Sequence, residues 1–301
     1  RGAVRYVTFE RDGRRSWGVV LDDRVLDLPA LAARVGRGPL PDDLLGFVQA
    51  GDEAASTARA VIEASRSRLL EVGVPLAAVR LLAPIPRPPK NVICIGLNYE
   101  DHAAEGGHPK PEAPVYFTKA ANNVIGPEAP VVADHRVTQK LDWEVELAVV
   151  VGRGGRFIPA ERALDHVFGY TVLNDISARD LQRGRGQWFL GKSLATGCPI
   201  GPWIVDKEEI PDPHALEIAL RVNGVTKQHA NTRLMIFSVA YIIQDLSAVF
   251  PLEPGDIIAT GTPAGVGFAR KPPEFLQPGD VVEAEIERIG VLRNPVVAPS
   301  E

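Results

Sequence analysis

The chain has 301 residues, of which 45% are hydrophobic and 24% charged, and its formal net charge at pH 7 is -5. This size and composition are typical of a globular protein with a substantial core, and a net negative charge gives no general attraction to nucleic acid or anionic membranes, so neither is an expected partner. No apolar run reaches the roughly 18 residues of a spanning helix, and the N-terminus lacks a signal-peptide pattern, which predicts a cytoplasmic location.

Residues 1–83 are predicted to form a small N-terminal α/β domain. Residues 4–28 read as short strands separated by turns, and residues 29–70 show apolar positions at helical spacing. A further strand is expected at 79–83. Four prolines then fall within six residues, which fixes an extended backbone that neither a helix nor a sheet interior accepts, so a linker is placed at 84–90.

Residues 91–301 are predicted to form a strand-rich second domain. Two helices are expected, at 160–166 and 237–249, and the Asn223-Gly224 pair predicts a hairpin turn. Because the strands are not regularly separated by helices, an α+β, β-rich fold is favoured over a doubly wound α/β fold. The predicted strands are 91–96, 115–118, 143–151, 170–175, 216–222, 256–260 and 281–287.

A group of carboxylates lies on two of these strands. Glu144 and Glu146 are two residues apart in a strand, so their side chains project from the same face with Cα atoms about 6.6 Å apart. Asp175 ends another apolar strand, where it is well placed at the rim of the sheet. Carboxylate ligands alone suit Mg²⁺, Mn²⁺ or Ca²⁺ rather than zinc, and a cation would offset the repulsion of these acids.

A simpler interpretation of the same spacing is a strand with one solvated face. Alternating charges are a common way to solvate a sheet, and the chain has 38 acidic residues to place. Asp142 is in phase with both glutamates and either extends the site or only surrounds it, so it is not included among the expected ligands.

Several ordered segments resemble the fumarylacetoacetate hydrolase family over roughly residues 91–297. The segments are IGLNYEDHAAE at 95–105, DWEVE at 142–146, NDISARDLQ at 174–182, GKS at 191–193 and GTPAGVG at 261–267. The family fold that this resemblance implies is a mixed β-sandwich roll, usually dimeric, so a homodimer is expected. The N-terminal part is similar to an extension carried by a bacterial subset of the family that includes oxaloacetate decarboxylases.

The resemblance implies a role for each matching residue. Glu144, Glu146 and Asp175 correspond to the ligands of Mg²⁺ or Mn²⁺, and His102 with Glu105 corresponds to a water-activating dyad. Three residues apart on a helical turn, this pair shares one face and can form a hydrogen bond. The other expected site residues are Lys192, as a catalytic group, and Arg179, Gln182, Lys119 and Thr262, as substrate-binding groups.

The expected substrate is a small 2-oxo acid that chelates the metal, and the expected intermediate is a metal-stabilised enolate. Leu97 occupies a position where many members that accept short dicarboxylic acids carry a cation, which favours a neutral distal group. Hydrolysis of a carbon–carbon bond in a 2,4-dioxo acid of the acylpyruvate type is therefore ranked first. Oxaloacetate decarboxylation or tautomerisation is the alternative, followed by a 2-hydroxyhepta-2,4-diene-1,7-dioate isomerase or a hydratase. A metal-binding scaffold without activity is disfavoured.

Overall fold

Short apolar strands separated by tight turns begin the N-terminal part, and four helices follow them. The computed structural model describes residues 2–301 of the chain. The elements of this part are β1 (Arg5–Arg11), β2 (Arg14–Leu21), β3 (Arg24–Asp27), α1 (Leu28–Arg34), α2 (Leu44–Ala50), α3 (Asp52–Arg66), α4 (Leu69–Val72), β4 (Val74–Pro75), the 3₁₀ helix η1 (Leu76–Ala78) and β5 (Arg80–Leu82).

The remainder of the chain is dominated by strands. Its elements are β6 (Val92–Gly96), α5 (Glu100–Glu105), β7 (Val115–Lys119), η2 (Ala121–Asn123), β8 (Val124–Ile125), β9 (Val131–Val132), β10 (Leu141–Asp142), β11 (Val145–Val151), η3 (Ala160–His166), β12 (Val167–Asn174), β13 (Ser177–Ala178), α6 (Arg179–Gln182), α7 (Phe189–Lys192), β14 (Cys198–Asp206), η4 (Lys207–Glu209), β15 (Glu217–Val222), β16 (Val225–Asn231), η5 (Thr232–Leu234), α8 (Val239–Val249), β17 (Ile257–Ala259), η6 (Gly267–Ala269), β18 (Val281–Ile286) and β19 (Gly290–Val297). The helix predicted at 160–166 is a 3₁₀ helix, and the helix predicted at 237–249 begins at Val239 behind a Ser238 N-cap.

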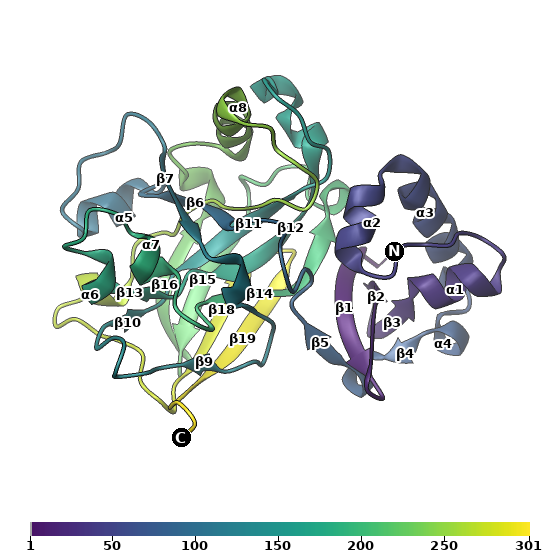
Figure 1. The fold of residues 1–301 in the computed structure, drawn as a ribbon, viewed down its shortest axis with the longest axis horizontal. Helices are drawn as coiled ribbons and strands as arrows, with labels where there is room; N and C mark the ends of the chain where they lie inside the picture. The colour runs from purple at the N-terminus through teal and green to yellow at the C-terminus, as the bar shows by residue number, and fades with distance from the viewer. Residues whose placement is uncertain (1) are drawn as a thin grey trace.

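Two main sheets organise the fold. The larger sheet has the order β4-β3-β2-β1-β14-β12-β11-β17-β6-β7, with β5 beside β1 and β8 beside β14. The second sheet has the order β16-β15-β18-β19-β9, and β15 and β16 meet at a turn where Asn223 and Gly224 both have positive φ, as the predicted hairpin requires. Figure 1 shows the second sheet, in green and yellow, within the larger lobe of the molecule.

The two faces of the larger sheet pack against different parts of the chain. Along β11, Leu147 and Val149 belong to a core shared with the second sheet and α8, whereas Ala148 and Val150 belong to a core shared with the N-terminal helices. This alternation is the period of two expected for a strand that is buried on both faces. The α+β, β-rich fold class predicted from the sequence is confirmed.

The N-terminal part joins the rest of the molecule through this sheet. Strand β1 pairs with β14 in antiparallel register, Arg5 opposite Val205, so the N-terminal strands continue the larger sheet. Trp17 lies in the same core as Cys94 and Ile200, which come from the strand-rich part. Figure 1 shows α1, α2 and α3 grouped at one end of the molecule. The domain boundary placed at 84–90 stays a prediction. Because the two parts share a core, unfolding experiments can test whether they fold as separate domains.

Candidate metal centre and active site

The register between β11 and β12 brings the three predicted metal ligands together. Val145 lies opposite Asn174, so the next position outward on each strand places Glu144 opposite Asp175. The Asp175 amide donates to the Glu144 carbonyl at 2.8 Å, and the Asn174 side chain accepts from the Glu144 amide at 3.0 Å. Opposite residues on an antiparallel pair share a face, and Glu146 shares that face because it is two residues from Glu144.

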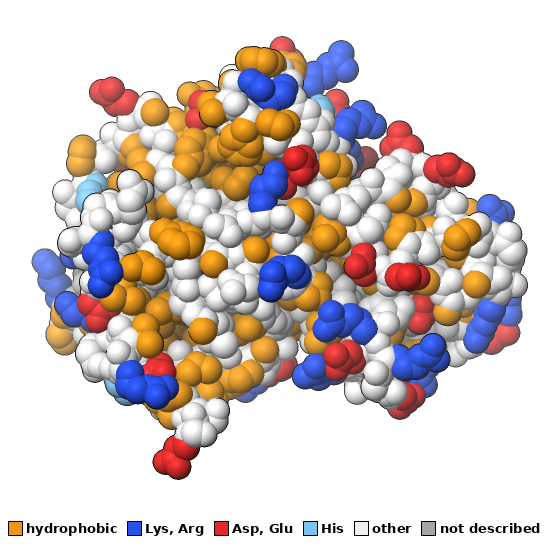
Figure 2. All heavy atoms as spheres, in the orientation of Figure 1, with side chains coloured by type: hydrophobic (Ala, Val, Ile, Leu, Met, Phe, Trp, Pro, Cys, Tyr) orange, Lys and Arg blue, Asp and Glu red, His pale blue; other side chains and the backbone are white. Residues whose placement is uncertain are grey.

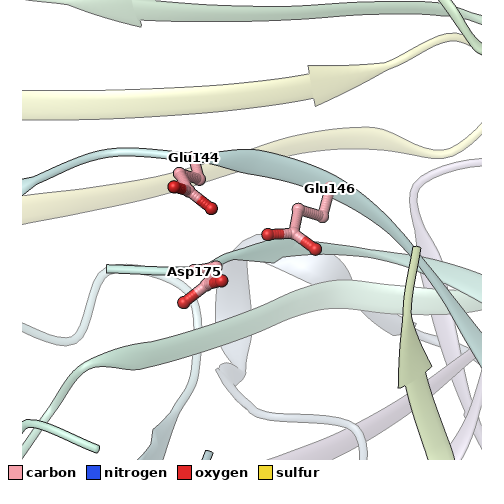
Figure 3. Close-up of side chains that lie close together, drawn as sticks. All are labelled: Glu144, Glu146 and Asp175. Carbon is pink, nitrogen blue, oxygen red and sulfur yellow. The ribbon is translucent and has the colours of Figure 1, made fainter. Parts of the chain in front are cut away.

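The resulting triad is deeply buried. One carboxylate oxygen from each of Glu144, Glu146 and Asp175 lies within 4.8 Å of the others, and the three residues are exposed by 4%, 1% and 0%. Figure 3 shows the three carboxylates gathered on one side of the two strands. The interpretation of Glu144 and Glu146 as a solvated strand face is therefore wrong, because no solvated face exists at these positions.

Three buried cations face the triad. Lys119 Nζ lies 2.6 Å from Asp175 Oδ1, and Lys192 Nζ lies 3.0 Å from Asp175 Oδ2. Lys192 also lies 3.2 Å from Glu144 Oε1, and Arg179 Nη2 lies 2.7 Å from Glu144 Oε2. Both lysines and Arg179 are therefore parts of one charge network with the predicted ligands.

Burial and these cations act in opposite directions on the carboxylates. Burial would raise the pKa of Asp175, but Lys119 and Lys192 lower it below its usual value, and Lys192 and Arg179 likewise outweigh burial at Glu144 and lower its pKa. The pKa of Glu146 is raised well above its usual value by burial and by the neighbouring Asp175 and Glu144. Glu146 is thus the carboxylate whose negative charge is least compensated by the protein.

The donor set fits a divalent cation. Counting the buried Asp142 with the triad, four carboxylates face three permanent cations, so the cluster has one negative charge in excess when all are ionised. The buried Tyr99 hydroxyl also lacks a hydrogen-bond partner within residues 2–301, and Glu146 contributes to the raised pKa of that hydroxyl. Oxygen donors and excess negative charge suit a hard metal ion, and a bound ion or its water would also account for the unpaired hydroxyl.

The predicted dyad forms on α5. His102 Nδ1 and Glu105 Oε1 are 2.8 Å apart, and the second Glu105 oxygen accepts from the Gly265 amide at 2.9 Å. Because Nδ1 is held in this way, His102 is left with Nε2 for contact with a substrate. His102 is also close enough to Glu144 to contribute to the lowering of its pKa, so the dyad borders the triad.

The glycine-rich loop after β17 binds carboxylates of the protein through its backbone amides. The Gly261 amide donates to Glu146 at 2.9 Å, and the Gly267 and Phe268 amides donate to the two oxygens of Asp142 at 2.8 and 2.9 Å. The Gly265 amide of the same loop donates to Glu105. One loop therefore positions an acid of the dyad, an acid of the triad and the neighbouring Asp142.

A pocket of about 450 Å³ borders the dyad and the triad. The predicted residues that line it are His102, Glu144, Arg179, Gln182, Lys192 and Thr262. Gln182 accepts from Arg179 at 3.0 Å, and the Thr262 hydroxyl accepts from Gln228 at 2.8 Å, which leaves the hydroxyl proton free to donate. Lys119 has no exposed surface and contacts Asp175 and the Ile176 carbonyl, so the structure places it behind the triad and not on the pocket wall.

Comparisons with known proteins agree with this architecture. The family model described as "Fumarylacetoacetate (FAA) hydrolase C-terminal" matches residues 91–297. The chain belongs to the fumarylacetoacetate hydrolase family. It is 43% identical over 300 residues to the oxaloacetate tautomerase YisK of Bacillus subtilis (strain 168), a match that covers 97% of this chain and 100% of the relative.

Two solved structures of the family extend this result to the whole chain. A fumarylacetoacetate hydrolase from psychrophilic Exiguobacterium antarcticum matches with a TM-score of 0.84 and 40% identity, covering 99% of this chain and all of that one. A 2-hydroxyhepta-2,4-diene-1,7-dioate isomerase from Mycobacterium marinum matches with a TM-score of 0.76 and 33% identity, again covering 99% of this chain and all of that one. The family-type fold is therefore confirmed, and the chain is an enzyme of this family.

The structure adds detail to the surroundings of the site. Asp142, which the sequence left open as an extension of the site or part of its surroundings, lies 2.9 Å from Arg179 Nε, so it positions a cation. The sequence signal was its spacing of two residues from Glu144, which also contacts Arg179. Trp188, Phe268 and Arg183 also line the pocket, and nothing in the sequence pattern singled out Phe268 or Arg183. No helix among residues 2–301 is long and apolar enough to cross a membrane.

Proposed function

We propose that the protein is a divalent-metal-dependent tautomerase that interconverts the keto and enol forms of oxaloacetate. The observation that carries the proposal is a carboxylate-supported histidine, His102, on the wall of the pocket that reaches Glu144 of the acidic triad. Support comes from the Bacillus subtilis relative, which is named an oxaloacetate tautomerase and matches the chain over 97% of its length. Acylpyruvate hydrolysis, which the sequence ranked first, stays an untested prediction and becomes the second candidate.

The triad is the proposed site for Mg²⁺ or Mn²⁺, because its three oxygen donors suit hard divalent cations. Such an ion would supply a Lewis acid that polarises the 2-oxo group and makes the hydrogens on C3 more acidic. With the divalent ion added, the cluster of four carboxylates and three cations changes from one excess negative charge to one excess positive charge. That balance favours an anionic substrate.

The protein's own groups account for the proton transfer. In the keto-to-enol direction one proton leaves C3 for His102, and the imidazolium that forms returns one proton, directly or through solvent, to the oxygen on C2, so no atom is gained or lost. His102 Nε2 is the proposed acceptor of the C3 proton, since Glu105 holds Nδ1 at 2.8 Å and stabilises the imidazolium that forms. Arg179 and Gln182 line the same pocket and are proposed to orient the C1 carboxylate and the 2-oxo oxygen.

Lys192 has an electrostatic role in this scheme. Burial would lower the pKa of Lys192, but Asp175 and Glu144 outweigh burial and raise that pKa above its usual value. Lys192 therefore remains an ammonium at neutral pH and stabilises negative charge on the substrate oxygen, with no need to give up its proton.

The test is to dissolve the enol form of oxaloacetate from dry solvent into buffer and follow the loss of enol absorbance with and without the protein. We expect acceleration with Mg²⁺ or Mn²⁺ and none with a chelator, with all of the product recovered as keto-oxaloacetate. Release of CO₂ in proportion to turnover would indicate decarboxylation instead. Absence of acceleration with either ion would rule out the tautomerase.

Hydrolysis remains the second candidate because the same dyad is able to activate water, and the relative from Exiguobacterium antarcticum is named a fumarylacetoacetate hydrolase. Incubation with acetylpyruvate distinguishes the two activities, since hydrolysis yields pyruvate and acetate. The expected homodimer is likewise a proposal, which light scattering of the purified protein tests.

A further inference from the structure

The outer part of the pocket contains a cation without a carboxylate partner. Three permanent cations line the pocket, namely Arg179, Arg183 and Lys192. Arg179 and Lys192 are paired with acids of the site, but none of the ion pairs formed among residues 2–301 includes Arg183. Its positive charge is therefore available to a ligand.

A phenyl ring fixes Arg183 near the chemical centre. The Arg183 guanidinium carbon lies 4.6 Å from the centre of the Phe268 ring, and the Arg179 guanidinium carbon lies 4.5 Å from the same centre. The two guanidinium groups are therefore at most about 9 Å apart, the sum of these distances. The Arg183 amide also donates to the Arg179 carbonyl at 3.2 Å, which ties the residue to the end of α6.

The position of Phe268 limits where this cation can lie. Phe268 belongs to η6, and its backbone amide donates to Asp142. The Cζ atom of its ring lies 3.7 Å from the position that a Cβ would occupy on Gly106. The ring is therefore close both to the end of the dyad helix and to the two arginines. Gly184 and Gly186 follow with φ of 84° and 77° and line the pocket as well, so the segment that carries Arg183 borders the pocket.

We infer that Arg183 binds the C4 carboxylate of the substrate and makes the enzyme selective for a diacid. The inference rests on the proposed function, which places the C1 carboxylate and the 2-oxo group at the triad. A four-carbon diacid then directs its second carboxylate toward the outer pocket, where a guanidinium is the side chain best suited to bind it.

This assignment revises the argument drawn from Leu97. An apolar residue at that position favoured a neutral distal group, and Leu97 does line the pocket. The segment after α6 nevertheless brings a cation to the same pocket. A distal carboxylate is therefore matched by Arg183, although the residue before Asn98 is apolar.

The chain offers a matched control two residues away. Arg185 is exposed like Arg183 and lies in the same turn, but it does not line the pocket. Replacing either arginine removes one positive charge from the same surface segment. Only replacement of Arg183 is expected to weaken binding of the substrate.

The experiment compares the wild type with Arg183→Ala, Arg183→Gln and Arg185→Ala, each with Mg²⁺ or Mn²⁺. Two substrates are used, namely oxaloacetate and its 4-methyl ester, which keeps the C1 carboxylate and the 2-oxo group but has no charge at C4. For both Arg183 variants KM for oxaloacetate should rise roughly tenfold, as expected for one charge-assisted contact at a partly exposed site, with kcat little changed. KM for the ester should stay at its wild-type value.

The outcomes separate the two levels of the proposal. If the wild type fails to tautomerise oxaloacetate, the proposed function is overturned and this inference with it. If the wild type is active but Arg183→Ala and Arg183→Gln keep the wild-type KM, or raise KM equally for the ester, only the role of Arg183 is overturned. The same rise in KM with Arg185→Ala would show a general effect of surface charge and would also overturn it.

Discussion

At the scale of single residues, Glu146 differs from the other acids of the site. Glu144 and Asp175 each have cations within hydrogen-bonding distance, whereas Glu146 accepts from the Gly261 amide and has no ion pair within residues 2–301. Burial raises its pKa well above the usual range, and Asp175 and Glu144 add to that effect. Keeping Glu146 ionised is therefore costly until a cation binds next to it.

Glu146→Gln should separate metal binding from folding. The glutamine keeps an oxygen for the Gly261 amide and breaks no ion pair, so the free energy of unfolding in a chelator should not fall. When the metal concentration is 100 times its dissociation constant, the free energy of unfolding of the wild type should increase by about 2.7 kcal/mol. That of the variant should not increase. Thermal unfolding with and without Mn²⁺ measures both quantities. Glu283→Gln, on β18 outside the site, is the control, and a wild-type response in Glu146→Gln would contradict the ligand assignment.

The His102–Glu105 pair has a counterpart elsewhere in the molecule. His229 Nε2 lies 2.8 Å from Glu217 Oε2, the same separation as in the dyad, but the His229 side chain is 64% exposed and does not line the pocket. Loss of a general base lowers rates by about 10² to 10⁴, so His102→Ala should reduce kcat by that factor, and Glu105→Gln by less because it acts through His102. His229→Ala should leave kcat unchanged. A near wild-type kcat for His102→Ala would remove the dyad from the mechanism.

Strand periodicity placed Glu144 and Glu146 on one face but left a solvated face as an alternative, and the family resemblance was needed to assign both, with Asp175, as metal ligands. The contacts of Lys119 and Arg183 could not be predicted in this way. Lys119 was expected at the substrate and lies behind Asp175, and the Arg183 guanidinium packs on Phe268, 85 positions later in the sequence. These contacts depend on packing between segments that are distant in the sequence, and local sequence patterns do not predict such packing.

At the scale of elements, the loop from Gly261 to Phe268 links the two halves of the site. Its amides bind Glu146 of the triad, Glu105 of the dyad and Asp142, which in turn holds Arg179. Because these donors lie on one short segment, a change in the loop backbone would displace the dyad relative to the triad. The loop is therefore a positioning element for proton transfer.

Gly265→Ala should show this effect. Gly265 has φ of 107°, and a Cβ there would lie 2.1 Å from the Lys227 carbonyl oxygen, so the loop must move. Gly279 has φ of 98° with no atom within 4 Å of an added Cβ, so Gly279→Ala has the backbone strain of about 1–2 kcal/mol without the clash. We expect Gly265→Ala to lose most of its kcat while still binding Mn²⁺, and Gly279→Ala to keep kcat. Equal kcat in the two variants would contradict a positioning role for the loop.

Elements with strong local signals were predictable, and those defined by pairing were not. The turn at Asn223-Gly224 and helix α8 follow from turn chemistry and apolar spacing. Strand β14 was missed because Pro199, Gly201 and Pro202 interrupt its pattern, yet it is the strand that joins β12 to β1 in the sheet. Its place in the fold comes from its two neighbours and not from its own propensity.

At the scale of the whole molecule, the N-terminal part and the strand-rich part share a sheet and a core. The larger sheet passes from β1 through β14 to β12 and β11, which contain or directly adjoin the triad residues. Figure 2 shows basic and acidic side chains interspersed over both lobes on the face that it presents. A continuous sheet implies that the stability of the N-terminal part and of the metal site are coupled.

This coupling predicts that Trp17→Ala destabilises the site, although Trp17 lies in the N-terminal part. Trp17 is fully buried, and loss of a buried tryptophan costs about 3–5 kcal/mol, so the variant should unfold at a lower temperature in a single calorimetric transition. Hydrogen exchange of peptides from β11 should accelerate together with that of β2, and Mn²⁺ should raise the midpoint of the entire transition. Phe157→Ala, at a side chain that is 69% exposed, is the control and should change neither quantity. Two separate transitions, with exchange in β11 unaffected by Trp17→Ala, would instead show that residues 1–83 fold independently behind the proline-rich segment.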